Sequence, residues 1–122
     1  MRLILSFLLL AHGVAHLPGF LVAWNLASFP DLPYRTTVFG TVDVGIPGAR
    51  LLGVGWLLSA VVFIALAATV ALRSDVPLVV LPLALGFSAV LCVAAWPEAR
   101  FGFVANSLIA AMMVAGERYG FV

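Results

Sequence analysis

Four long apolar runs constrain this chain more than any other feature of its sequence. They cover about residues 3–24, 49–72, 76–96 and 101–118. A helix of about 20 apolar residues crosses a hydrocarbon core of roughly 30 Å, and each run approaches that length. The sequence therefore predicts an all-α, polytopic membrane protein with one domain, residues 1–122, in which four transmembrane helices form a bundle.

The composition agrees with lipid as the main solvent of this chain. Hydrophobic residues make up 65% of the sequence and charged residues only 9%, whereas an average soluble domain is about half apolar and about a quarter charged. The net charge is +1, and all the basic residues are arginines that are scattered along the chain. Because nothing forms a basic patch, nucleic acid is excluded as an expected partner.

The predicted links between the helices differ in length. Residues 73–75 and 97–100 make two short links, whereas residues 25–48 make a long first link that is rich in proline and glycine. Its segment 36–39 has the composition of a strand, which predicts a short hairpin or a lid. Links this long in compact domains are often functional.

Small residues indicate where the helices pack against one another. They recur at four-residue spacing, which allows helix backbones to approach closely in lipid. The predicted packing seams are Ala11, Ala15 and Gly19; Gly55 and Ser59; and Ser107, Ala111 and Ala115.

His12 and His16 are the most distinctive polar residues of the first run. Their i, i+4 spacing places both on one face of a helix, and ionisable groups at membrane depth are functional candidates by default. Four interpretations are open: a metal, a haem, proton transfer or hydrogen bonding to a ligand, and hydrogen bonding between helices. The sequence favours no metal, since no carboxylate lies inside a helix to complete its shell. A haem would need Met112 or Met113 as the opposite ligand, and the sequence indicates no particular cofactor.

Several further polar residues are predicted to gather at one end of the bundle. In a four-span topology the first and third links emerge on the same side, above His16. Polar groups around the mouth of an apolar pocket are typical of small-molecule sites. An ion pair between Asp43 and Arg50 that closes the long link is the simpler interpretation of those two residues. The candidate ligand-binding residues at this end are Asn25, Asp43, Arg50, Trp96, Glu98, Arg100 and Asn106.

Two motifs resemble a widespread family of small bacterial four-helix membrane proteins. Residues 11–20, AHGVAHLPGF, are similar to its HGxxHLxGF start, and residues 96–106, WPEARFGFVAN, are similar to its WxDAKFGxxAN segment. Glu98 and Arg100 replace the aspartate and lysine of that segment, which keeps the charges but changes the reach of the side chains. The resemblance implies a multi-pass protein of the bacterial inner membrane, and it implies no reaction.

A looser similarity relates the helix layout to DoxX-like proteins, four-helix bundles that are associated with membrane redox and quinone chemistry. This similarity concerns the fold alone. Small fluoride channels and multidrug exporters have a similar size, but the first helix lacks the glycine–arginine motif of the former and the embedded glutamate of the latter.

The orientation of the bundle is weakly determined by charge. Three arginines lie on each side of the expected membrane, so the positive-inside rule gives no preference. The amine of Met1 adds a charge on the side of the termini, and we expect both termini in the cytoplasm.

The function predicted first is a pocket for a small, partly lipophilic ligand, such as a quinone, an isoprenoid or a lipid fragment. His16, with His12 behind it, would form hydrogen bonds or exchange protons, and Arg50 and Arg100 would hold an anionic or carbonyl group. Enzymatic activity is an open question. One alternative is a noncatalytic subunit or chaperone of a larger membrane complex, and another is a small transporter or channel that forms a homodimer.

Overall fold

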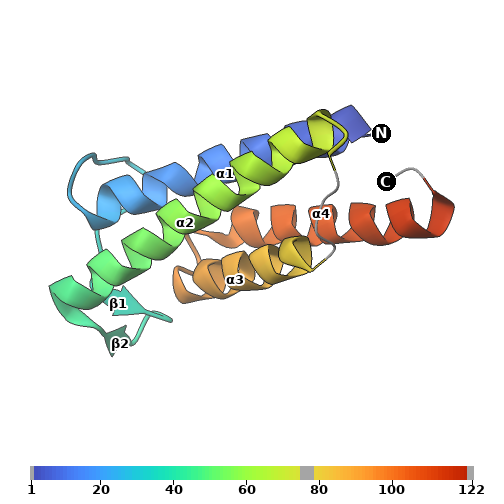
Figure 1. Ribbon diagram of the computed structural model, residues 1–122. Coiled ribbons are helices and arrows are strands. Elements are labelled where there is room, and N and C mark those ends of the chain that lie inside the picture. Colours follow the sequence, from blue (N-terminus) through green and yellow to red (C-terminus); the bar gives the residue numbers. More distant parts are fainter. Residues whose placement is uncertain (1, 75–78, 121–122) are drawn as a thin grey trace.

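The part of the chain that the structure describes folds into four helices and one small hairpin (Figure 1). This computed structural model describes residues 2–74 and 79–120. The elements are α1 Arg2–Ala23, β1 Thr37–Val38, β2 Val42–Asp43, α2 Gly45–Ala71, α3 Val80–Ala94 and α4 Arg100–Tyr119. The predicted all-α fold and the predicted hairpin in the long link are confirmed.

Two predicted helix boundaries differ from the observed ones. Helix α2 begins at Gly45 rather than at residue 49, and α3 ends at Ala94 rather than at residue 96. The early end of α3 follows from Pro97, because a proline disfavours helical backbone in the residue before it. The predicted start of this helix, residues 76–78, lies outside the described residues, as does Asp75 of the predicted link.

The helices run alternately up and down and form two pairs (Figure 1). Helices α1 and α2 lie side by side over most of their length, and α3 and α4 form the second pair. The first link, its hairpin and the link between α3 and α4 therefore lie at one end of the molecule. The start of α1 and the end of α4 lie at the other end, as the four-helix topology predicts.

Glycines explain the close contact between α1 and α2. A Cβ atom at Gly13 would lie 3.1 Å from the carbonyl oxygen of Ala60, and one at Gly19 would lie 2.7 Å from the ring of Trp56. A Cβ atom at Gly53 would lie 2.7 Å from the ring of Trp24. A larger residue at any of these three positions would clash, so the glycines allow the two helices to approach closely.

Two of the predicted packing seams are wrong in part. Ala11 and Ala15 are exposed, and so are Ser107 and Ala111, because the faces of α1 and α4 that turn inward carry the polar network described below. The seam of Gly55 and Ser59 is confirmed: Gly55 lies against the side chains of α3, and Ser59 is buried.

The interior and the exterior are both apolar. The core at the end remote from the first and third links is built from large aliphatic and aromatic side chains, among them Leu9, Phe63 and Ile109. Large apolar side chains are also exposed on every helix: Phe7, Leu51, Leu83 and Val104 are each more than 60% exposed. Among the described residues, α1 and α2 are long and apolar enough to cross a membrane, whereas the apolar helix α3 is shorter.

Candidate functional site

The site begins with the two histidines of α1. Their i, i+4 spacing turns both rings towards α2, and they are only 4% and 2% exposed. The ring of His12 meets that of His16 edge to face, with centroids 4.5 Å apart, and lies 4.8 Å from the ring of Phe63. The ring of His16 lies 5.3 Å from that of Trp56. Aromatic side chains of α2 therefore fix the orientation of both imidazoles.

Polar side chains of α3 and α4 join the histidines in one hydrogen-bond network. Nδ1 of His16 lies 2.7 Å from the carbonyl oxygen of His12, and its Nε2 lies 2.7 Å from Oγ of Ser88. Nε2 of His12 lies 2.9 Å from Oδ1 of Asn106 and 3.3 Å from Oγ of Ser88. The amide of Asn106 donates to Oγ of Ser88 over 2.9 Å. Residues of three helices thus satisfy one another inside an apolar bundle, where an unpaired polar group is costly.

When both rings are neutral, the contacts determine which group donates and which accepts in each hydrogen bond of the network. The carbonyl of His12 only accepts, so Nδ1 of His16 donates to it, and its Nε2 accepts the hydroxyl proton of Ser88. Oγ of Ser88 then accepts from the amide of Asn106, whose oxygen accepts from Nε2 of His12. His12 therefore carries its proton on Nε2 and has a lone pair on Nδ1.

A cavity of about 490 Å³ lies between this network and the links. Its wall is formed by α1, the first link, the first half of α2, the end of α3 and the start of α4. His12 and His16 are its deepest lining residues on α1, since His12 lies roughly 16 Å along the helix from Ala23. The volume falls within the usual range of small-molecule sites, about 300–1,000 Å³.

The first link covers the cavity and is fastened at two points. Arg35 of this link forms an ion pair with Glu98 of the link between α3 and α4, with 2.6 Å between the guanidinium and the carboxylate. The amide of Phe39, at the turn of the hairpin, donates to the carbonyl oxygen of Ala94 at the end of α3 over 2.9 Å. The positive φ angles of Phe39 and Gly40 make that turn tight enough for the contact. The first link is thus held against the end of α3 and the link that follows it.

Five of the predicted site residues are brought together. His12, His16 and Asn106 form the network, and Trp96 and Glu98 line the cavity above it. The geometric reason is the one predicted: alternating helix directions bring the first and third links to the same end of the bundle.

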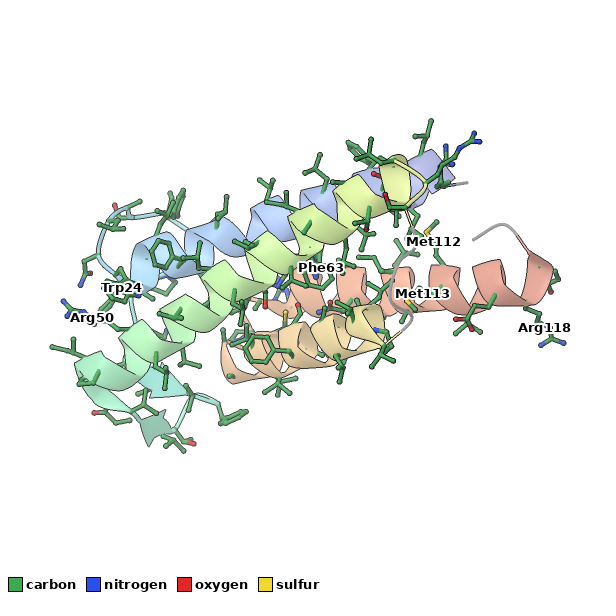
Figure 2. All side chains as sticks on the ribbon, viewed as in Figure 1. Trp24, Arg50, Phe63, Met112, Met113 and Arg118 are labelled. Carbon is green, nitrogen blue, oxygen red and sulfur yellow. The ribbon has the colours of Figure 1, made fainter. Side chains whose placement is uncertain are left out.

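The other four predicted site residues lie elsewhere. Figure 2 shows Trp24 and Arg50 together at the link end of α1 and α2, where the guanidinium carbon of Arg50 lies 5.3 Å from the centroid of the Trp24 ring. Asp43 has a different partner: its carboxylate accepts from the amide of Gly45 over 2.8 Å. The predicted ion pair between Asp43 and Arg50 is therefore absent.

Arg100 and Asn25 are also outside the cavity wall. The guanidinium carbon of Arg100 lies 5.0 Å from the centroid of the Phe101 ring, and the carboxylate of Glu98 is paired with Arg35 rather than with Arg100. Asn25 is exposed and has a φ of 53° just after the end of α1. It terminates the helix, a role that asparagine takes readily because it tolerates left-handed backbone.

Sequence reasoning missed two central residues, Ser88 and Arg35. Ser88 lies in an otherwise apolar helix and looks like a tolerated small residue, although a hydroxyl at that depth needs a partner. Arg35 lies in the long link, and no local pattern identifies its partner. Only the tertiary structure identifies Arg35, because it shows the carboxylate of Glu98, with a side chain 16% exposed, paired with the guanidinium of Arg35.

The short distance between Ser88 and His16 resembles that of a nucleophile and its base. Ser88 is nevertheless completely buried, and the residues that line the cavity do not include it. A substrate in the cavity would not reach its hydroxyl. The hydrogen bond therefore holds the imidazole of His16 in place and offers no nucleophile.

Within residues 2–74 and 79–120, no group of three or more histidine, cysteine, aspartate or glutamate side chains is placed to hold a metal ion. Comparison with models of protein families, with curated proteins and with solved structures gives no match to this chain.

Proposed function

We propose that the chain is a four-span protein of the bacterial inner membrane, with both termini in the cytoplasm. Its exterior supports this proposal, because large apolar side chains are exposed on α3 and α4 as well as on α1 and α2. A bundle in water would leave far less contiguous apolar surface uncovered. The resemblance of residues 11–20 and 96–106 to small bacterial four-helix membrane proteins belongs to the same proposal.

We further propose that this bundle binds a small, partly lipophilic ligand in the cavity beneath the first link. The observation that carries the proposal is the coincidence of a mostly apolar cavity with a buried, fully connected polar network at its deepest point. Val22, Leu52 and Trp56 offer an apolar wall to the body of the ligand, and His12 and His16 offer imidazoles to its polar end. A quinone, an isoprenoid or a lipid fragment has this division into an apolar body and a polar end.

The histidines have distinct roles in this proposal. His12 is the group that meets the ligand, because His16 uses both ring nitrogens in bonds with the protein. Ser88 and Asn106 hold the two rings and connect them, so a proton that enters or leaves at His12 changes the hydrogen bonds of the whole network. Arg35 and Glu98 keep the first link closed over the ligand.

Native mass spectrometry of the detergent-purified protein tests the proposal. We expect the wild type to carry a non-covalent small molecule, and we expect the variant His12→Ala/His16→Ala to lose it. Ser107→Ala is a matched control, since Ser107 lies on the outer face of α4 and its hydroxyl donates only to its own helix. A wild type without any small molecule, or an adduct that persists in the double histidine variant, refutes the ligand pocket.

A further inference from the structure

The charges around the cavity restrict the ligand that it accepts. The lining residues include two carboxylates, Asp31 and Glu98, and a single guanidinium, that of Arg35. The guanidinium is already paired with Glu98 at 2.6 Å. An anionic ligand would therefore enter a space where the described lining residues have an excess of negative charge and where the guanidinium of Arg35 already has a partner.

The arginines that the sequence offered as anion-binding groups do not change this balance. Arg50 and Arg100 are exposed, are absent from the cavity lining, and lie over the rings of Trp24 and Phe101. Charges taken into an apolar site without a partner are strongly disfavoured. The cavity thus disfavours an anionic ligand.

The direction of the hydrogen-bond network restricts the polar end of the ligand as well. Nε2 of His12 donates to Asn106, so Nδ1 of the neutral ring is an acceptor. Nδ1 of His12 takes part in no side-chain hydrogen bond of the described residues. It is also not one of the fully enclosed polar atoms without a partner, so it keeps some accessible surface. His12 lines the cavity. A ligand that reaches His12 therefore meets a lone pair and needs a donor to match it.

We infer that the cavity selects a ligand without negative charge whose polar end is a hydroxyl group that donates a hydrogen bond to Nδ1 of His12. Phenols, quinols and isoprenoid or fatty alcohols form this class, and carboxylates and phosphates lie outside it. The inference rests on the proposed ligand pocket and adds the charge and the hydrogen-bonding sense of the ligand. The charged lining and the directed network support it independently.

Three probes with the same apolar tail test this inference on the wild-type protein in detergent. They are para-hexylphenol, which donates; para-hexylanisole, which only accepts; and para-hexylbenzoate, which is an anion at neutral pH. Native mass spectrometry gives the bound fraction of each, and the shift of the unfolding midpoint gives an independent measure, because a ligand stabilises the state that it binds. We expect the phenol to bind about tenfold more tightly than the methyl ether, since one net hydrogen bond is worth about a factor of ten. The benzoate should bind more weakly than both.

The outcomes separate this inference from the proposed function. Binding of the benzoate or the methyl ether as tightly as the phenol overturns the inference and leaves a ligand pocket in place. Failure of all three probes to bind overturns both. His12→Leu adds a site-specific readout, because the preference for the phenol over the ether should fall to about one in this variant, whereas Ser107→Ala should keep it. If His12→Leu does not fold, the three probes on the wild type still decide the question.

Discussion

Replacement of Asn106 by alanine should destabilise the bundle far more than replacement of its neighbour Ser107. Asn106 is 4% exposed and bonds with side chains of α1 and α3, whereas Ser107 is exposed and its hydroxyl donates to a carbonyl of its own helix. The two variants change adjacent positions of α4 and leave the helix propensity of the segment nearly equal. The difference between them therefore isolates the network.

The magnitude follows from the contacts that are lost. Asn106→Ala removes two hydrogen bonds of 2.9 Å and leaves Nε2 of His12 with only the longer contact to Ser88, at 3.3 Å. Interhelical hydrogen bonds in membrane proteins average about 0.6 kcal/mol each, and a poorly paired buried donor costs about 1–3 kcal/mol. We expect the free energy of unfolding to fall by about 2 kcal/mol, against less than about 0.5 kcal/mol for Ser107→Ala.

A double-mutant cycle then tests whether the residues act as one network. Ser88→Ala alone should cost as much as Asn106→Ala, because it removes bonds to His16 and Asn106. The double variant should cost less than the two single variants together by about 1 kcal/mol, since residues that share a network are not additive.

Equilibrium unfolding in mixed micelles, with circular dichroism and tryptophan fluorescence as readouts, provides these free energies. Equal effects of Asn106→Ala and Ser107→Ala would show that α4 is not bonded to α1. Full additivity of Ser88→Ala and Asn106→Ala would show that the two side chains do not meet.

Three further predictions concern packing, the lid and the topology. Gly53→Ala should lower the free energy of unfolding by about 1–3 kcal/mol, because its Cβ atom would meet the indole of Trp24 at 2.7 Å. Gly86→Ala, whose Cβ atom would meet nothing within 4 Å, should be neutral or stabilising, and equal effects of the two variants in a micelle unfolding assay would contradict the close contact between α1 and α2. Arg35→Gln should raise hydrogen–deuterium exchange in residues 25–48, and it should lower the free energy of unfolding by less than about 1 kcal/mol because the guanidinium is half exposed. Unchanged exchange would show that the ion pair does not hold the first link in place. The topology can be tested with a membrane-impermeant maleimide in a variant whose single cysteine is replaced by alanine. The reagent should label Thr41→Cys in intact cells and Ser74→Cys only after the membrane is opened. Labelling of both positions from the same side would refute the four-span topology.

The local sequence determines the elements of this fold. Long apolar runs predict helices because a chain in lipid must satisfy its backbone groups within each segment. The composition of residues 36–39 predicts the hairpin, and the positive φ angles of Phe39 and Gly40 complete it. The spacing of His12 and His16 predicts one face, and both rings turn to α2. Each of these features depends on residues that are close in the chain.

The candidate site depends on residues that are far apart in the chain. Ser88 lies 72 residues from His16, and Asn106 lies 94 residues from His12. Sequence reasoning placed Asn106 near the link end because helix length and alternation fix its depth, but it gave no reason for Ser88 to face inward. It also paired Asp43 with Arg50, whereas Arg50 lies over Trp24 and Glu98 is bonded to Arg35.

The sequence by itself thus determined which segments are helical and that the first and third links lie at the same end of the bundle. The tertiary structure decided which polar groups are partners and where a cavity remains. The physical reason is that periodicity and hydropathy are properties of one segment, whereas a hydrogen bond such as that of His16 with Ser88 depends on the rotation of two helices about their own axes. That rotation is set by the packing of side chains from several helices at once.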